Sequence, residues 1–221
     1  MYQSPIVIER ALTENGEIQL QKRGSDYEII FNGTFLMATY NGDSEKLLVR
    51  WAIETADSPK TVLIAGLGVG FSLAEAQNHK MIEKITVVEI EQKIIEWNRT
   101  YLSASSEGAL TQQNVDVVNT DFIQWMKKPQ KKYDVICLDI DNGPDWVVLD
   151  DNNELYSHRG IYNLLKLMNK RGAVSFWSAA ESHLFEEVLR KYFNGVYVKE
   201  VNHKSGEPDY IYLAHNPKIT A

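Results

Sequence analysis

Two aspartates separated by one residue lie at the end of an apolar run that predicts a buried strand at 133–139. They are Asp139 and Asp141, and more acids follow at Asp145, Asp150, Asp151 and Glu154. Neighbouring carboxylates can bind an ammonium group, and one of them can act as a base toward it. A primary amine, with a pKa of about 10.4 by analogy with lysine, must lose a proton before it attacks. The segment is therefore either a site for a cationic amine or a solvated acidic loop.

A glycine-rich turn in the first half of the chain is the second segment suited to chemistry. An apolar strand at 62–65 runs into Gly66-Leu67-Gly68-Val69-Gly70 and then into a predicted helix. Glycines allow a tight turn and let the backbone approach a ligand that a Cβ atom would obstruct. A dinucleotide fingerprint requires Gly-x-Gly-x-x-Gly, but Phe71 takes the sixth position here, which favours a nucleoside over NAD. The alternative is a tight strand–helix turn without a ligand.

Two acids downstream are placed to contact such a nucleoside. Glu89 follows Gly70 by 19 positions, at the end of the next predicted strand, where a carboxylate can accept from both ribose hydroxyls. Asp121 begins a short predicted helix at 121–127 and is suited to cap it. The same carboxylate can accept from the exocyclic amine of adenine. Asp121 can therefore act as a helix cap alone, or as a cap that also contacts adenine. For Glu89, the alternative to a ribose contact is an acid on the protein surface.

The elements that must position these residues alternate along most of the chain. Strands are predicted at 61–65, 84–90, 115–118, 133–139 and 173–177, and the clearest helices at 43–57, 91–101, 158–170 and 180–193. Such alternation predicts a mostly parallel sheet with right-handed crossovers, whose ligands lie beyond the carboxyl ends of the strands. The last strands, at 196–201 and 210–214, are too close for a helical crossover, so they predict an antiparallel hairpin. The fold class is α/β, with a seven-stranded, methyltransferase-type Rossmann-like sheet.

The first 42 residues follow a different pattern. Short apolar or alternating runs between residues 5 and 40 are separated by Asn15-Gly16 and Asn32-Gly33. Asn-Gly between such runs is a strong hairpin signal, because both residues tolerate the positive φ of a type I′ turn. We therefore expect two consecutive hairpins and no helix across 17–35. The predicted domains are a small β-hairpin domain at 1–42 and a nucleoside-binding catalytic domain at 43–221.

Composition narrows the possible partners. The 221 residues include 23 basic and 30 acidic side chains, a net charge of −7, which gives no global electrostatic reason to bind nucleic acid. The five histidines show no close ligand pair, so no metal site is expected. The single cysteine, Cys137, allows no intrachain disulfide, and neither a signal peptide nor a membrane-spanning run is visible. We expect a cytoplasmic protein that does not bind membranes.

These segments, together with 87–90, 119–121 and the run from Leu155-Tyr156 to Gly160-Ile161-Tyr162, resemble the spermidine synthase family of polyamine aminopropyltransferases. The resemblance implies that Asp139 is the catalytic base. It implies a nucleoside site made of Gly66, Gly68, Gly70, Glu89, Ile90, Asp121 and Phe122. It also implies an acceptor-amine site made of Glu45, Asp141 and Tyr156.

The resemblance also implies substrates and assembly. The donor would be decarboxylated S-adenosylmethionine, the acceptor putrescine or another polyamine, and the protein a homodimer. Two segments depart from the family pattern. Asp139-Ile140-Asp141-Asn142-Gly143-Pro144 is two residues shorter than the family's Asp-x-x-Asp-Pro-x-Gly-Pro loop. Asp43-Ser44-Glu45 keeps only the acid of the family's Tyr-His/Gln-Glu segment.

Two other functions are compatible with the same residues. One is methyl transfer from S-adenosylmethionine, since one fold supports several reactions. The other is a non-catalytic protein that binds a nucleoside. The glycine turn contains no Lys or Arg that could hold the carboxylate of a methionine group, which favours a decarboxylated donor.

Overall fold

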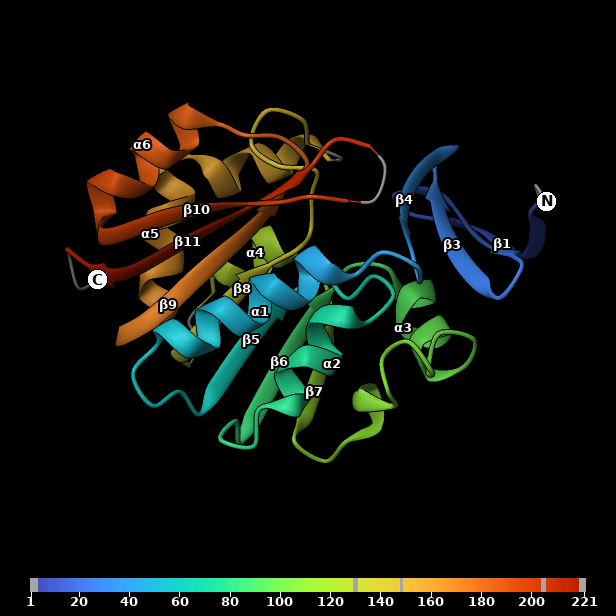
Figure 1. Cartoon of the computed structure of the whole chain (residues 1–221), viewed down its shortest axis with the longest axis horizontal. Helices are drawn as coiled ribbons and strands as arrows, with labels where there is room; N and C mark the ends of the chain where they lie inside the picture. Colours follow the sequence, from blue (N-terminus) through green and yellow to red (C-terminus); the bar gives the residue numbers. More distant parts are fainter. Residues whose placement is uncertain (1–3, 129–130, 148, 204–205, 219–221) are drawn as a thin grey trace.

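The larger of two β-sheets forms the centre of the molecule in the computed structural model, which describes residues 4–128, 131–147, 149–203 and 206–218 (Figure 1). This seven-stranded sheet has the order β10-β11-β9-β8-β5-β6-β7. Its strands are β5 (Thr61–Ala65), β6 (Lys84–Glu89), β7 (Val115–Asn119), β8 (Tyr133–Leu138), β9 (Met168–Ser178), β10 (Phe193–Val201) and β11 (Asp209–Pro217).

Strands β5 to β9 pair in parallel, and β11 pairs antiparallel with both β9 and β10. The mostly parallel sheet and its C-terminal antiparallel hairpin are therefore as the sequence predicted. Strand β5 lies in the middle, and its side chains alternate between two hydrophobic cores. Val62 and Ile64 face one core, and Leu63 and Ala65 face the other. Burial on both faces explains why this strand is a continuous apolar run.

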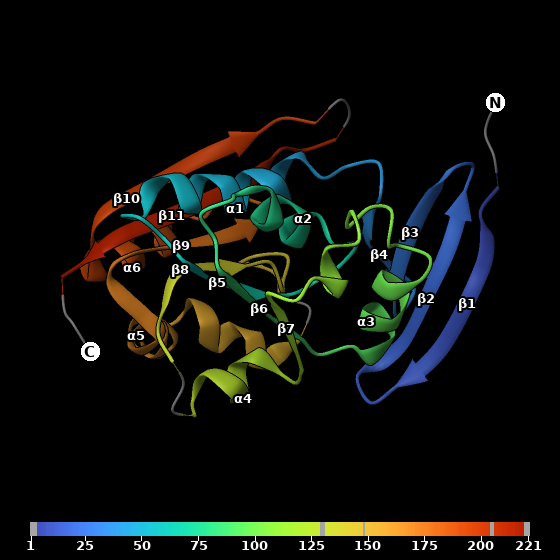
Figure 2. The same cartoon turned by 90° about the horizontal axis from the view of Figure 1, so that it is seen from below.

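Helices cover both faces of the sheet. They are α1 (Asp43–Thr55), α2 (Phe71–Asn78), α3 (Gln92–Arg99), α4 (Phe122–Met126), α5 (His158–Leu167) and α6 (His183–Tyr192), with 3-10 turns η1 (Ala109–Thr111) and η2 (Asp150–Tyr156). Helices α1 and α2 lie on one face, and α4 and α5 lie on the other (Figure 2). Each face thus has its own core, and the sheet separates them. No helix of the described chain is long and apolar enough to span a membrane.

The N-terminal sheet is a four-stranded antiparallel meander of β1 (Ile6–Thr13), β2 (Gly16–Arg23), β3 (Asp26–Phe31) and β4 (Thr34–Ala38). Both predicted hairpins are present, and 17–35 contains no helix. Asn32 and Gly33 have φ of 48° and 79°, as a type I′ turn requires. The first turn differs from the prediction: it consists of Glu14 and Asn15, because Gly16 already pairs with Thr13.

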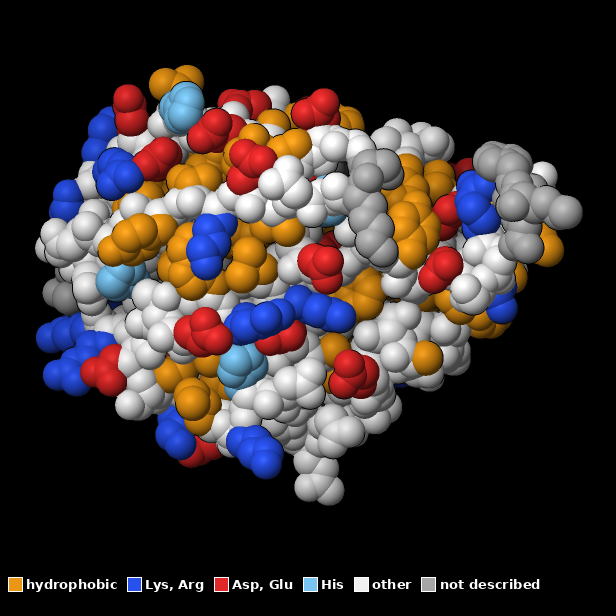
Figure 3. Space-filling model, viewed as in Figure 1, with side chains coloured by type: hydrophobic (Ala, Val, Ile, Leu, Met, Phe, Trp, Pro, Cys, Tyr) orange, Lys and Arg blue, Asp and Glu red, His pale blue; other side chains and the backbone are white. Residues whose placement is uncertain are grey.

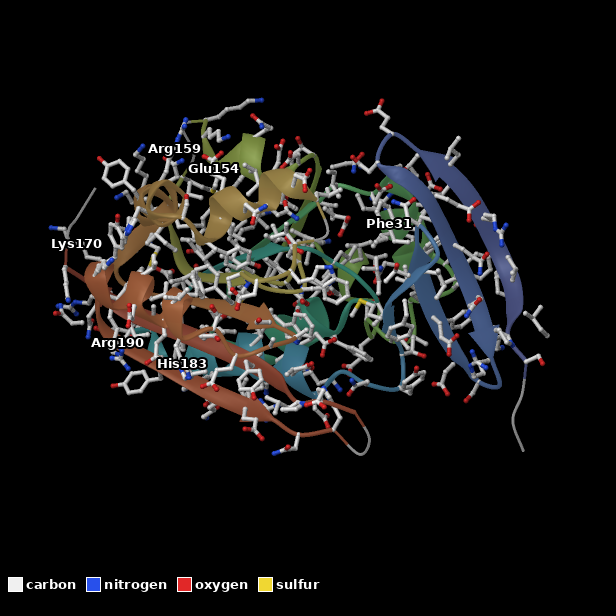
Figure 4. The ribbon with its side chains drawn as sticks, turned by 90° about the horizontal axis from the view of Figure 1, so that it is seen from above. Phe31, Glu154, Arg159, Lys170, His183 and Arg190 are labelled. Carbon is white, nitrogen blue, oxygen red and sulfur yellow. The ribbon has the colours of Figure 1, made fainter. Side chains whose placement is uncertain are left out.

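The two sheets share one hydrophobic core. Ile18, Leu20, Ile29 and Phe31 from the N-terminal sheet pack with buried side chains of α1, α2 and α3. Figure 4 labels Phe31, which lies on the side of its strand that faces the larger sheet. The predicted boundary after residue 42 falls between β4 and α1. The division into two domains at that point remains a proposal.

Helix α5 ends earlier than the sequence predicted. The predicted helix at 158–170 ends at Leu167, and strand β9 already begins at Met168. Met168 pairs with Tyr133 of β8, and the Asn169 side-chain amide donates to the Asp134 carboxylate at 2.7 Å. Contacts with a strand more than 30 positions away therefore override the local helical pattern. The predicted helices at 91–101 and 180–193 are likewise shorter, at Gln92–Arg99 and His183–Tyr192.

Candidate functional site

A cleft of about 1070 Å³, open space at its mouth included, lies at the carboxyl ends of β5, β6 and β8. Most of the predicted site residues line it: Glu45, Gly66, Gly68, Glu89, Ile90, Asp121, Phe122, Asp139 and Asp141. Gly70 and Tyr156 are not among its lining residues. The fold therefore brings nine of these eleven residues to one cleft.

The glycine turn shapes the floor of the cleft. Gly66 has a φ of 89°, and a Cβ atom built there would lie 2.0 Å from the main-chain oxygen of Asp139. Its main-chain N–H donates to the Val88 oxygen at 2.9 Å. Gly70 caps α2 with a φ of 93°, and a Cβ there would collide with Ser106 and Asn98. Gly66 thus keeps the turn against the end of β8, whereas Gly70 packs against the segment beyond α3.

Glu89 ends β6, and only 5% of it is exposed. Its Oε2 accepts from the main-chain N–H of Leu67 at 2.8 Å, and its Oε1 accepts from that of Glu91 at 2.8 Å. Burial raises the pKa of Glu89 to about 7, although these two hydrogen bonds act to lower it. Each carboxylate oxygen can accept a second hydrogen bond, so the group is positioned against the turn and still able to bind hydroxyls in the cleft.

Asp121 caps helix α4. Its Oδ1 accepts from the main-chain N–H of Ile123 at 2.6 Å, so the predicted cap is confirmed. Phe122 is 4% exposed and lies beside it on the cleft wall, together with Ile90. The Asn119 side-chain amide donates to the main-chain oxygens of Glu89 and Ile90, at 2.9 Å each. Asn119 therefore ties the ends of β6 and β7 together.

Asp139 lies one residue beyond β8, on the same floor. Its main-chain N–H donates to the Ala65 oxygen at 2.8 Å, and the Ser72 hydroxyl donates to its Oδ2 at 3.1 Å. Desolvation raises the pKa of Asp139 to about 6, the Ser72 hydrogen bond opposes the rise, and the charges of Asp209 and Glu89 add to it. This carboxyl is therefore mainly ionised at neutral pH and can accept a proton.

Glu45 lies in the first turn of α1, in the cleft near Asp139. It is 7% exposed, and burial together with the charge of Asp139 raises its pKa to about 8. The Ser44 hydroxyl oxygen lies 2.9 Å from its Oε2. Two carboxyls from segments almost a hundred residues apart thus occupy the same end of the cleft.

Of the other two predicted acceptor residues, Asp141 lies in the cleft lining and Tyr156 lies outside it. Asp141 is 7% exposed, lines the cleft, and accepts from the Asn142 N–H at 2.8 Å. It lines the same cleft as Asp139, two residues before it, as the period of two in an extended chain allows. The Tyr156 ring packs edge-on against Phe185, at 5.1 Å between ring centres, outside the cleft lining. Burial, followed by the charges of Asp141 and Asp139, raises the pKa of Tyr156 well above its ordinary range.

The N-terminal sheet supplies an apolar wall that the sequence reasoning did not identify. Ile18, Phe31, Leu36 and Met37 line the cleft, and Met37 contacts the glycine turn. The Met37 sulfur accepts from the Val69 N–H at 3.2 Å. A signal was present, since the residues of β2 and β3 that face this core are apolar. The sequence did not show that the face packs against the glycine turn.

The first turn of that sheet is attached to the nucleoside side of the cleft. The Asn15 side-chain amide donates to Glu91 Oε1 at 2.7 Å, and the Thr13 hydroxyl donates to the same oxygen at 3.2 Å. Glu91 follows Glu89 by two residues, and its main-chain N–H donates to the Glu89 carboxylate. The N-terminal sheet is therefore connected to the predicted ribose contact through a short series of hydrogen bonds.

Comparison with known proteins gives the family. Residues 44–207 match the spermine/spermidine synthase domain, and the chain belongs to this family. Polyamine aminopropyltransferase of Saccharolobus solfataricus is 31% identical over 156 residues, 71% of this chain and 50% of the relative. The enzyme of the same name from Pyrobaculum calidifontis is 30% identical over 66% of this chain and 53% of its own. The chain thus spans about half the length of these curated relatives.

Solved structures show the same fold. A spermidine synthase in complex with the transition-state analogue AdoDATO superimposes with a TM-score of 0.78 at 21% identity, covering 97% of this chain and 74% of that one. Spermidine synthase from Thermotoga maritima gives a TM-score of 0.76 at 19% identity. The match covers 97% of this chain and 73% of that one. The α/β fold predicted from the sequence is confirmed.

Proposed function

We propose that this protein transfers an aminopropyl group from decarboxylated S-adenosylmethionine to the amine of a polyamine such as putrescine. One observation carries the proposal: the described residues that line the cleft include six acids and no Lys, Arg or His. The acids are Glu45, Glu89, Glu91, Asp121, Asp139 and Asp141. A cleft of this charge favours a sulfonium donor with a free amine and a cationic acceptor. The names of the polyamine aminopropyltransferase relatives agree with this reaction.

The nucleoside half of the proposal uses the glycine turn and the ends of β6 and β7. Glu89 accepts from the ribose hydroxyls, Asp121 accepts from the adenine amine, and Ile90 and Phe122 enclose the base. Gly66 and Gly68 let the main chain approach the sugar and the chain at sulfur. We assign Gly70 to the packing that supports this turn, since its missing Cβ makes room for Ser106 and Asn98.

The acceptor half uses the acids at the other end of the cleft. An ammonium bound between Glu45, Asp139 and Asp141 loses one proton to Asp139, and the neutral nitrogen attacks the propyl carbon beside the sulfonium. The new C–N bond forms as the C–S bond breaks, and methylthioadenosine leaves with the electron pair on sulfur. Tyr156 supports this end from behind, through its packing on Phe185 and Phe176.

A methyltransferase is the runner-up, and the lining argues against it. S-adenosylmethionine carries a carboxylate that a site normally neutralises, and the described lining offers no cationic side chain for it. The discriminating experiment is product analysis with each donor. We expect methylthioadenosine from decarboxylated S-adenosylmethionine with putrescine, spermidine or cadaverine. S-adenosylhomocysteine from S-adenosylmethionine, or no product from either donor, would contradict the proposal.

We further propose a cytoplasmic homodimer whose reaction needs no metal. Family membership supports the dimer, and so do the exposed apolar side chains of Ile6 and Leu12 on the edge strand β1. The single cysteine agrees with a reducing compartment. Light scattering on the purified protein tests the assembly, and a mass equal to one chain would exclude the dimer.

A further inference from the structure

One hydroxyl group lies between two carboxyls at the acceptor end of the cleft. The Ser44 oxygen is 2.9 Å from Glu45 Oε2 and 2.6 Å from Asp209 Oδ2. It also accepts a hydrogen bond from the Trp177 ring N–H at 3.1 Å. Asp209 begins β11, 165 positions along the chain from Ser44.

The number of protons in this arrangement is limited. A hydroxyl carries one hydrogen and two acceptor lone pairs, and the Trp177 ring already occupies one lone pair. If Glu45 and Asp209 were both ionised, only one could receive the hydroxyl proton. The remaining carboxylate oxygen would then face a lone pair of the Ser44 oxygen with no hydrogen between them. The site would also hold two negative charges close together with little solvent. That arrangement is costly, so one of the two carboxyls carries a proton that it donates to Ser44.

The surroundings identify Glu45 as the protonated group. Asp209 has a second polar partner that can favour its ionised form, since the His203 ring Nε2 lies 2.8 Å from Asp209 Oδ2. The charged groups that face Glu45 are Asp139 and Asp209, both acids. Lys46, next to it on α1, holds its ammonium over the Phe71 ring instead, 5.1 Å from the ring centre. Burial, followed by the charges of Asp139 and Asp209, raises the pKa of Glu45 to about 8.

We infer that Glu45 is a neutral carboxylic acid when the acceptor end is empty, that it donates its proton to Ser44, and that a bound ammonium group replaces this proton. The exchange is balanced: a neutral acid and an incoming ammonium ion become a carboxylate–ammonium pair and one released proton. The protonation of the empty site stands on the geometry around Ser44, whereas the replacement by an ammonium rests on the proposed function.

The same contacts provide a route by which the proton can leave. Ser44, Asp209 and His203 form a continuous series of close polar contacts from Glu45 toward the surface. The side chains of His203 and Asp209 are 12% and 13% exposed, so the outer end of this chain reaches solvent. These three residues act on the acceptor through Glu45 and are positioning residues, not catalytic ones.

Infrared spectroscopy tests the proton on Glu45 without any ligand. A protonated carboxyl absorbs in a region separate from carboxylates. We expect a carbonyl band at pH 6.5 that is stronger in the wild-type protein than in Glu45→Gln, where Glu89, with a pKa of about 7, still contributes. The difference between the two spectra should disappear with a midpoint near pH 8. Glu186→Gln, on the opposite face of the sheet in α6, is the control and should keep the band. Identical spectra for wild type and Glu45→Gln would overturn the inference.

Calorimetry tests the exchange of the proton. Putrescine is titrated into the methylthioadenosine complex at pH 7 in phosphate and in Tris, whose ionisation enthalpies differ. We expect the wild type to release about one proton per bound diamine, because Glu45 is mostly protonated at this pH. Glu45→Gln should release none. Asp209→Asn should release less, because its amide can donate to Ser44 and leave the hydroxyl proton for an ionised Glu45.

The two experiments separate the possible failures. Equal proton release by wild type and Glu45→Gln would overturn the exchange. If putrescine does not bind, the exchange fails together with the proposed acceptor, while the infrared band still decides whether the empty site holds a proton on Glu45. Methylthioadenosine release without proton exchange would keep the proposed function and reject the inference.

Discussion

Three carboxyls in the cleft share desolvation as the main cause of their raised pKa values, and they differ in their polar neighbours. Two main-chain N–H groups donate to Glu89, and the Ser72 hydroxyl donates to Asp139. Glu45 contacts the Ser44 hydroxyl and lies near two other acids, Asp139 and Asp209. The pKa values of Glu89, Asp139 and Glu45 rise to about 7, 6 and 8 respectively. The order agrees with the proposed roles, because the group with the lowest value is the one that must be ionised to accept a proton.

Glu89→Ala should weaken the binding of methylthioadenosine by about 2–3 kcal/mol, the amount expected for a lost charge-assisted hydrogen-bonding group. Calorimetry measures the effect. Glu83→Ala is the control, because Glu83 lies just before β6 with a side chain that is 69% exposed. Equal affinities of Glu89→Ala and wild type for methylthioadenosine and for S-adenosylmethionine would remove Glu89 from the nucleoside site.

Asp139→Asn should leave nucleoside binding nearly intact and lower turnover by about 10²–10⁴-fold, since an amide cannot accept the amine proton. Asp141→Asn should act mainly through the KM for the acceptor. Both are measured as methylthioadenosine release with putrescine. If Asp141→Asn abolishes turnover and Asp139→Asn does not, the base is assigned to the wrong residue.

The pH dependence of turnover follows from the same group. Asp139 must be ionised to accept a proton, and its pKa is raised to about 6 by desolvation. Activity per bound acceptor should therefore rise as the pH increases through about 6. The rate profile between pH 5 and 7.5 measures this limb, and an acid limb that persists unchanged in Asp139→Asn would contradict the assignment.

At the scale of elements, the turn between β5 and α2 brings the nucleoside half and the acceptor half together. Gly66 lies against the main chain of Asp139, so the same backbone contact shapes both halves of the cleft. The helix α1 adds Glu45 from one side, and β11 adds Asp209 from the other. Small changes in this turn should therefore affect both stability and turnover.

Gly66→Ala should be much more destabilising than Gly33→Ala. Both glycines have similar positive φ values, 89° and 79°, for which an L residue costs about 1–2 kcal/mol. The Cβ at position 33 meets nothing within 4 Å, whereas the one at 66 would lie 2.0 Å from the Asp139 oxygen. Urea unfolding compares the variants. Equal losses in stability would show that the turn relaxes without cost.

At the scale of the whole molecule, the outer surface and the cleft differ in the charges they carry. Acidic and basic side chains are interspersed on the face that Figure 3 shows. In the structure, partly exposed charges form ion pairs such as Arg50–Glu75 and Lys60–Glu83. All the charged side chains in the described lining of the cleft are acidic. The net charge of −7 therefore understates how strongly the cleft attracts a cation.

Stability should fall as the pH rises from 6 to 9. The folded-state pKa values of Glu45 and Glu89 lie above the ordinary value of 4.5. Their contribution to folding is therefore fully present below about pH 4.5 and is lost as the pH rises through about 7 and 8, by on the order of a few kcal/mol. Thermal unfolding at both pH values measures the loss, and Glu45→Gln should show a smaller one. A Tm that rises over this interval would contradict the burial of these acids.

The sequence by itself determined most of the elements and which acids lie at the ends of the strands. Apolar runs, the glycine turn and Asn32-Gly33 are local signals, because strand burial and positive φ depend on neighbouring residues. They predicted the strand pattern, the C-terminal hairpin and the acids at the strand ends. The positions of Glu89, Asp121 and Asp139 in one cleft follow from these signals, since the carboxyl ends of parallel strands meet at one edge.

Only the tertiary structure decided where distant segments meet. The early end of α5, the apolar wall from the N-terminal sheet and the position of Tyr156 behind the cleft all depend on packing between separated elements. The contact of Ser44 with Glu45 and Asp209 joins positions 165 residues apart. No local pattern encodes such a contact, because the protonation of Glu45 depends on groups that chain folding alone brings within hydrogen-bonding distance.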